Sequence, residues 1–197
     1  MGNPRDLTQT QIDNIQIDEG IAFLDYGETT QRKLAPLRGG CEFNGKTVLR
    51  DIEYDGRRGK TKGMQAIESQ EASIKASTLA SSQENIKLAL QNLKVTGSGD
   101  NMTISNPTDN GVVGAENYLK NMTVFGRKIG GRWKKITICN PMNEGDLSMK
   151  FVQKSENEHG LTMYAHFDPL DSEKSLYTIE DVPDAPADPP ADPPAGP

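Results

Sequence analysis

The chain has 197 residues, of which 34% are hydrophobic and 6% aromatic, so it can bury only a small core for its length. Its formal net charge is −6, and the acids that cause it lie mostly within residues 180–197, which leaves no basic excess of the kind typical of nucleic-acid-binding proteins. Two isolated cysteines, no apolar run of membrane-spanning length and no signal-peptide core favour a reduced, cytosolic protein.

The first forty residues predict an arm, a strand and a loop. Residues 1–20 are polar with one short stretch that contains three isoleucines, so we interpret them as an arm ending in a strand. Residues 21–26 form an apolar run typical of a second strand. Residues 27–40 lack periodicity, which indicates a loop.

An Asn-Gly step and a long polar run mark the next region. Asn44-Gly45 separates residues 41–43 from residues 46–55 and predicts a two-residue hairpin, because type I′ turns favour this pair. A basic loop, residues 56–63, follows. Residues 64–79 alternate weakly and contain neither glycine nor proline, so we predict a strand with one face in water.

One helix is expected. Ser81 and Glu84 fit a capping box, in which the hydroxyl and the carboxylate satisfy backbone amides at the start of the helix. The apolar stripe that follows at helical spacing consists of Ile86, Ala89, Leu90 and Leu93. Because a single helix cannot bury such a stripe alone, we expect it to lie on a sheet.

The second half of the chain predicts hairpins. Gly130-Gly131 separates residues 122–129 from residues 132–138, and this pair predicts a two-residue turn in which both glycines have positive φ. Two further strands are predicted from alternating apolar residues, which are Leu147, Met149 and Phe151 in one and Leu161, Met163, Ala165 and Phe167 in the other. Together these patterns predict one-sided antiparallel sheet.

Shorter elements complete the prediction. Residues 97–115 are a loop with a short strand at residues 102–104, and residues 176–179 form a last apolar strand. Residues 181–197 alternate proline and aspartate, so we expect an extended, disordered tail.

For each candidate catalytic, metal or cofactor motif, a purely structural role explains the residues better. Gly59-Lys60-Thr61 resembles part of a phosphate-binding loop, but Tyr54 stands where the first glycine is needed and no helix is expected after the turn. His159 lies in a predicted turn, and neither it nor His166 has a cysteine nearby to share a metal ion. We therefore expect a protein that is not an enzyme and binds no cofactor or metal.

Four bases cluster in the loop 56–63, namely Arg57, Arg58, Lys60 and Lys62. They suit either an acidic patch on a neighbouring subunit or nucleic acid. No aromatic residue lies between Tyr54 and Lys62 to stack on bases, so we favour the protein contact. A small β-domain that binds nucleic acid through this loop is the alternative function.

Four segments occur in an order that resembles one protein family. They are Leu49–Gly63 (LRDIEYDGRRGKTKG), Glu84–Leu90 (ENIKLAL), Trp133–Ile138 (WKKITI) and His166–Asp171 (HFDPLD). Together they resemble the major tail (tail tube) protein of bacteriophages with long non-contractile tails, or its counterpart in phage-tail-like bacteriocins. The resemblance implies a mainly β fold, a β-sandwich or barrel with one flanking α-helix.

The resemblance also implies an assembly. Six copies would close into a ring, rings would stack into a tube, and long hairpins of every copy would join an inner β-barrel between subunits. The implied partners are further copies of the chain and the tape measure, tail terminator and distal tail or baseplate proteins. DNA, or ions in a bacteriocin, would cross the lumen without specific binding. Such a protein assembles in the host cytoplasm, becomes part of the virion tail and does not contact a membrane.

Within that scheme we expect three parts: an N-terminal arm (1–20), a tail-tube β-domain (21–180) and a disordered tail (181–197). The hairpin 46–55 with the strand 64–79 would line the lumen, and the acids facing it would be Asp51, Glu53 and Glu71. Duplex DNA carries one negative charge per roughly 1.7 Å, so a neutral-to-acidic lumen would let it slide. The four bases would contact a neighbouring subunit or ring, and the arm and the loop 27–40 would connect rings.

Overall fold

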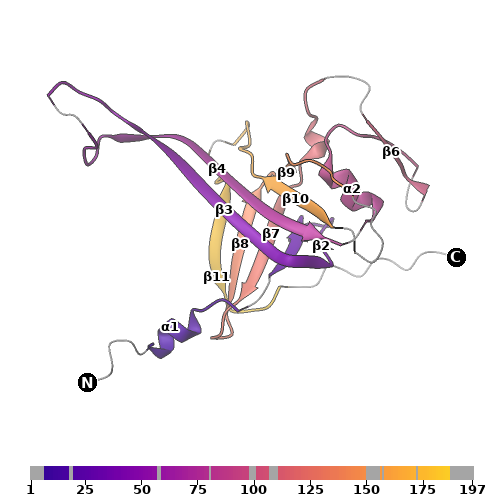
Figure 1. Ribbon diagram of the computed structural model, residues 1–197, viewed down its shortest axis with the longest axis horizontal. Helices are drawn as coiled ribbons and strands as arrows, with labels where there is room; N and C mark the ends of the chain where they lie inside the picture. Colours follow the sequence, from indigo (N-terminus) through magenta and orange to yellow (C-terminus); the bar gives the residue numbers. More distant parts are fainter. Residues whose placement is uncertain are drawn as a thin grey trace.

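The computed structural model describes residues 7–17, 20–56, 59–79, 81–97, 101–106, 111–149, 156, 158–171 and 173–186, and these form mainly antiparallel β-sheet (Figure 1). The five-stranded sheet contains, in spatial order, β11 (Tyr177–Val182), β8 (Trp133–Cys139), β7 (Asn121–Arg127), β1 (Ile21–Leu24) and β2 (Arg32–Leu34). The four-stranded sheet contains β3 (Leu37–Asp51), β4 (Gln65–Thr78), β10 (His159–Tyr164) and β9 (Met142–Asn143). The smaller elements are α1 (Gln9–Asp13), α2 (Gln83–Ala89), the 3-10 turn η2 (Ala115–Asn117) and the pair β5 (Lys94–Thr96) and β6 (Thr103–Ser105).

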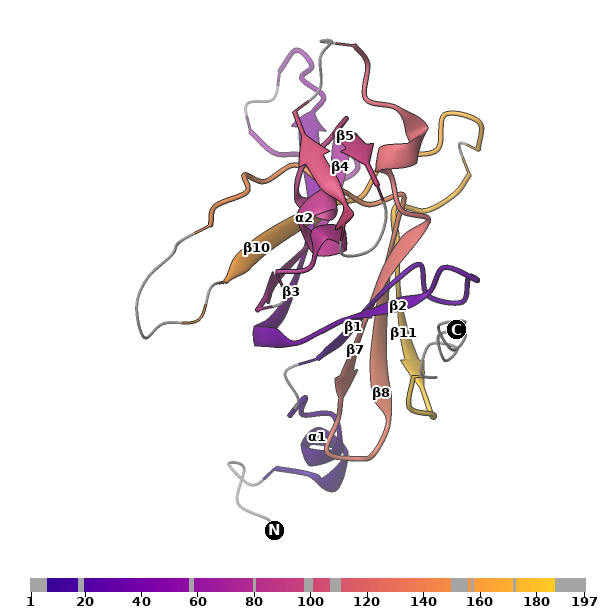
Figure 2. The same cartoon turned by 90° about the vertical axis from the view of Figure 1, so that its right-hand side faces the viewer.

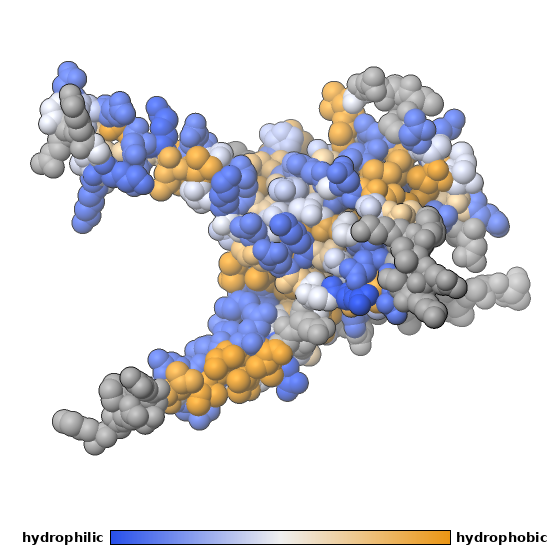
Figure 3. All heavy atoms as spheres, in the orientation of Figure 1, coloured by the Kyte–Doolittle hydropathy of each residue, from blue (hydrophilic) through white to orange (hydrophobic). Residues whose placement is uncertain are grey.

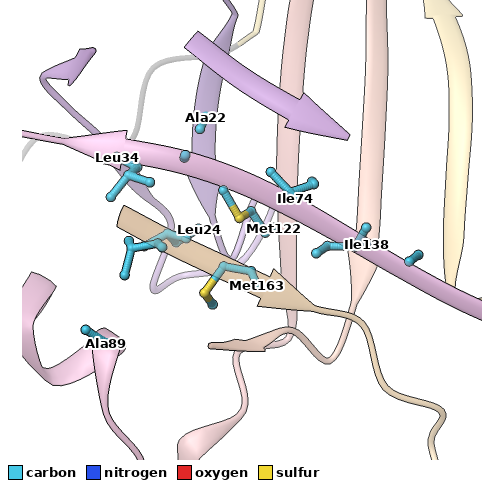
Figure 4. Packing of buried hydrophobic residues seen from close by; sticks show 11 residues of the cluster. Ala22, Leu24, Leu34, Ile74, Ala89, Met122, Ile138 and Met163 are labelled. Atoms are coloured by element: carbon cyan, nitrogen blue, oxygen red, sulfur yellow. The ribbon is translucent and has the colours of Figure 1, made fainter. Parts of the chain in front are cut away.

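The hydrophobic core lies between the two large sheets. Leu24, Met122 and Ile138 extend from the five-stranded sheet and cluster with Ile74 and Met163 from the four-stranded sheet (Figure 4). All five side chains are buried. The predicted β-sandwich with one flanking helix is therefore confirmed, and alternate residues of β4 and β10 supply one half of its core.

The predicted hairpin at Gly130-Gly131 is confirmed, but its turn differs from the expected one. The amide of Gly131 donates to the carbonyl of Lys128 at 3.0 Å, and the amide of Lys128 donates to the carbonyl of Arg132 at 2.9 Å. Of the two glycines in this turn, only Gly131 has a positive φ, +83°. The turn therefore has three residues and needs one left-handed glycine, whereas a type I′ turn needs two.

The hairpin predicted at Asn44-Gly45 is wrong. β3 continues through both residues, and Gly45 pairs with Ala72 in the middle of the sheet. A Cβ on Gly45 would lie 3.2 Å from the ring of Phe43 and 3.6 Å from that of Tyr177. The glycine therefore makes room for two aromatic rings. The loop predicted for 27–40 is also partly wrong, because it contains β2 and the start of β3.

Helix α2 is confirmed, with a shifted cap and a different buried face. Ser82, not Ser81, is the N-cap, and its hydroxyl accepts from the amide of Asn85. Asn85 and Ala89 are the buried residues of the helix, whereas Leu90 of the predicted stripe is exposed. The polar Asn85 is tolerated in this position because its side chain accepts a hydrogen bond from Arg32 at 3.0 Å.

The strand predictions near the C-terminus have mixed outcomes. Leu161 and Met163 are buried on β10 as expected, but Phe167 is 53% exposed. Residues 147–149 belong to no strand, and Phe151 lies outside the described residues. β11 continues through Val182, past the expected start of the tail at 181, while residues 187–197 lie outside the described part of the chain.

The N-terminal arm contains a short helix that was not predicted, and the arm ends in the strand-like residues 15–17, where a strand was expected. Thr8 and Gln11 form a capping box at the start of α1. Beyond the helix the arm lies against the turn between β7 and β8, where Gln16 forms an isolated bridge with Lys128. Lys128 Nζ donates to Asn14 Oδ1 at 3.2 Å and thereby ties the arm to the five-stranded sheet.

Candidate assembly surface

The outer half of the pair β3–β4, which we call the ribbon (residues 44–51 with 65–73), is largely exposed. It projects from the body as two strands (Figures 1 and 3). β10 pairs with β4 only over Ser73–Thr78, so nearly all of the ribbon lies beyond the third strand. Isolated two-stranded ribbons are marginally stable in water, and in the described part of the chain no further layer covers this one.

The ribbon has two open edges. β3 is the terminal strand of its sheet along its whole length. The opposite edge, on β4, has no neighbouring strand from Gln65 to Glu71 within the described residues. Open edges present unpaired amides and carbonyls, which readily accept another strand.

One face of the ribbon carries an apolar pair, Leu49 and Ile67, which are cross-strand partners. Leu49 lies an even number of residues from Phe43, which turns toward the core, so both point to the same side of β3. The register shifts at Glu68, an extra residue in β4 that keeps Ile67 opposite Leu49. Leu49 is 52% exposed and Ile67 is 60% exposed. The apolar face of the four-stranded sheet therefore continues past the five-stranded sheet that covers its inner part.

The three acids expected together do not share a face. Asp51 lies on the face of Leu49 and accepts a hydrogen bond from Gln65 at 2.6 Å. Glu71 lies on the other face, where it pairs with Lys46 at 3.3 Å. Glu53 lies beyond the end of β3, beside a hollow of about 370 Å³ at the tip of the ribbon.

The tip of the ribbon carries the basic loop. Lys60 and Lys62 are exposed, while Arg57 and Arg58 lie outside the described residues. After Thr61 the chain turns, with the amide of Met64 donating to the carbonyl of Thr61, and then enters β4. The described residues on either side of this loop, β3 and β4, are strands, as predicted.

The two histidines have structural partners. His159, expected in a turn, is buried at the start of β10 with Nε2 2.7 Å from the hydroxyl of Ser81. His166 Nε2 lies 3.0 Å from Glu144 Oε1. Among the described residues no three His, Cys, Asp or Glu side chains are arranged to hold a metal ion.

Four ionisable groups of the described part of the chain have clearly shifted pKa values, and the shift is large in two of them, Asp181 and Cys41. Hydrogen bonds from Lys134 and Lys128 lower the pKa of Asp181 from 3.8 to about 2. Burial raises the pKa of the Cys41 thiol to about 11, which disfavours the reactive thiolate. Asp181 thus fastens β11 to β8, through Lys134, and to the turn between β7 and β8, through Lys128.

Comparisons with known proteins give little further information. No family model matches the chain, and no curated protein matches it. A chain from a solved structure described as the virion of a native gene transfer agent (GTA) particle is similar over 74% of this chain and 92% of that chain, with 13% identity and a TM-score of 0.36. A similarity of this extent does not define a function. In the described part of the chain no helix is long and apolar enough to cross a membrane.

Proposed function

We propose that this protein is a structural subunit that polymerises as stacked hexameric rings into a phage-type tail tube whose lumen conducts DNA, or ions in a bacteriocin. The family resemblance of the sequence suggests this function. The observation that carries the proposal is the ribbon, which combines two open edges with an exposed apolar pair.

Within the described part of the chain, the ribbon lacks strand partners for its edges and a cover for its apolar pair, and a further copy can supply both. An open edge is satisfied by another strand, and Leu49 and Ile67 are removed from water by another surface. A second copy offers both, because it brings a ribbon of the same length and a body beside it. The contact is head-to-tail, with one edge of a copy meeting the other edge of the next, and such contacts close into rings when the rotation permits.

The lumen in this proposal is lined by the face of the four-stranded sheet opposite the core. Strand alternation places three bases and two acids of β3 and β4 on that face: Lys46, Arg50, Lys75, Glu42 and Glu71. Charges of both signs interspersed in this way provide no strong field to retain duplex DNA. Glu71 keeps the lumen role in this proposal. Asp51 lies on the face proposed to meet a neighbouring copy.

The basic loop is proposed to make a second contact. Lys60 and Lys62, with Arg57 and Arg58, would meet acidic groups of a neighbouring subunit or ring. The exposed position of the two lysines supports this role, because they are free to reach a partner. Acids line the hollow beneath them, among them Asp51 and Asp55, which makes a contact with the phosphate backbone of DNA less favourable.

Introducing two charges on the apolar face of the ribbon tests the proposal. The double variant Leu49→Lys, Ile67→Lys should remain monomeric at concentrations at which the unaltered protein forms rings and tubes, as measured by sedimentation and negative-stain microscopy. Both side chains are exposed in the monomer, so its circular dichroism should not change. Ser69→Lys adds a base at the same level on the opposite face and should still assemble.

Two results would contradict the proposal. One is normal tubes from the double variant. The other is an unaltered protein that stays monomeric and binds duplex DNA with an affinity that falls steeply with salt, which would favour the alternative of a nucleic-acid-binding β-domain.

A further inference from the structure

The N-terminal arm and the β7–β8 turn form an apolar patch that faces away from the body. The amide of Ile17 donates to the carbonyl of Arg127 at 3.0 Å, and the amide of Ile129 donates to the carbonyl of Ile15 at 2.9 Å. This strand-like pairing sets Ile15, Ile17 and Ile129 on one side. We call these residues, with Leu7 of the same arm, the arm patch.

In this pairing the charged side chain points inward and the apolar side chains point outward, the reverse of the usual arrangement. Lys128 points inward and is only 7% exposed, because Asp181 and Asn14 bind its ammonium group. The isoleucines point outward instead, with 43% of Ile15, 58% of Ile17 and 44% of Ile129 exposed. Figure 3 shows the resulting apolar surface along the lower projection. A cluster of exposed apolar side chains held by backbone hydrogen bonds indicates a surface that a partner covers.

A groove of about 490 Å³ lies near the opposite end of the same two strands. We call it the end groove, and its apolar and aromatic walls include Val113, Tyr118, Phe167 and Pro169. Phe167 is 53% exposed, and Leu170, three residues on, is 94% exposed. The wall is held in place by His166, whose carbonyl accepts from Asn140 Nδ2 at 3.2 Å and whose ring contacts Tyr118 edge-on.

The two sites lie at opposite ends of β7 and β8. The end groove includes Lys120 and Asn140, which directly precede β7 and directly follow β8. The arm patch lies at the far end of β7, because its Ile17 donates to the carbonyl of Arg127, the last residue of that strand, and its Ile129 follows two residues later. Seven strand residues span about 20 Å, and Figure 2 shows α1 beyond the lower end of these strands.

The prevailing charges around the two sites are opposite, although Asp13 lies beside the turn at the arm patch and Lys120 lines the end groove. Exposed Arg127 and Arg132 flank the arm patch. The loop that carries Phe167 continues with three acids and one base: Asp168, Asp171, Glu173 and Lys174. An apolar patch with a basic rim therefore fits an apolar groove with an acidic rim, and the same chain supplies both.

We propose that the arm patch of one copy docks in the end groove of a second copy, and that this is the axial contact between stacked rings. The proposal rests on the proposed function for its setting in a tube. A patch that binds a different site at the far end of the next molecule makes a head-to-tail contact that does not close, so it propagates along an axis. The ribbon would then form rings, and the arm patch would join them.

Single acidic substitutions in each site test the axial contact. Ile17→Asp and Phe167→Asp place a carboxylate on an exposed position, so the monomer should fold normally. Each variant should give separate rings without tubes in negative-stain images. Thr10→Asp, on an exposed polar position of α1, is the matched control and should give tubes of normal length. Normal tubes from both variants would overturn the inference and leave the proposed function intact.

A cross-link identifies the partner directly and does not depend on tubes. Mixing an Ile17→Cys protein with a Phe167→Cys protein under mild oxidation should yield a disulfide between positions 17 and 167 of different molecules, identified by mass spectrometry. Failure of this link to form at concentrations that produce tubes would overturn the inference. If the link forms but no rings are ever seen, the proposed function fails while the head-to-tail contact stands.

Discussion

The two longest hairpins of the molecule differ in what covers them. β7 and β8 are each seven residues long and lie between β1 and β11, so both of their edges are paired. β3 and β4 are twice as long, but among the residues that the structure describes neither a third strand nor a second layer covers their outer halves. A long strand is therefore not necessarily paired and covered along its whole length. The uncovered part of a strand shows where a partner is needed.

The sharpest way to test this difference uses two isoleucines of one strand. Ile74 of β4 is fully buried and Ile67 is 60% exposed. Ile74→Ala should lower the free energy of unfolding of the monomer by about 2–5 kcal/mol, because it leaves a cavity in the core. Ile67→Ala should change it by less than about 0.5 kcal/mol.

Urea denaturation of the monomer measures both values, and sedimentation of the assembled form completes the test. Ile67→Ala should weaken assembly although it leaves the monomer intact. Equal losses of monomer stability in the two variants would mean that the outer half of β4 is already packed in the single molecule.

A smaller effect is expected where β11 is fastened to the closed sheet. The folded-state pKa of Asp181 is lowered to about 2 by Lys134 and Lys128, so the ionised carboxylate stabilises the fold above its ordinary value of 3.8. This contribution is lost as the pH falls from about 4 toward 2, because over this range a proton binds Asp181 in the unfolded state but not in the folded state, which favours unfolding. The difference in urea midpoint between the unaltered protein and Asp181→Asn should therefore shrink over this range. A constant difference from neutral pH to pH 2 would contradict it.

The smallest expected effect lies on the open ribbon. The ion pair of Lys46 and Glu71 joins two side chains that are 61% and 53% exposed, and exposed pairs contribute only about 0.2–1 kcal/mol. A double-mutant cycle with Lys46→Ala and Glu71→Ala in the monomer should give a coupling energy in this range that decreases with added salt. A larger, salt-independent value would show that the ribbon is already shielded from water.

Much of the fold could be predicted from local pattern. The hairpin at residues 122–138, the strand at residues 64–79 and the helix after Ser82 each depend on periodicity or capping, which are properties of adjacent residues. The failure at Gly45 has the opposite cause. Its neighbours in sequence favour a turn, but packing against Tyr177, far along the chain, fixes it in a strand.

The candidate surfaces were less predictable. Which acids share a face depends on the extra residue at Glu68 and on the register of β3 with β4, and neither can be counted from a weakly alternating sequence. The helix of the arm had a readable signal, because Thr8 and Gln11 fit a capping box. No signal in the sequence predicts the outward direction of Ile17, since that direction depends on pairing with Arg127, over a hundred residues away.

The opposite directions of β3 and β4 have a consequence for stoichiometry. When the free edge of β4 in one molecule meets the free edge of β3 in the next, up and down strands continue to alternate, so no hydrogen-bonding pattern limits how many molecules can join. The number is then set by curvature, and the bulge at Glu68 is a local source of bend and twist. Deleting that single residue would alter the diameter of the closed assembly before it altered whether one forms.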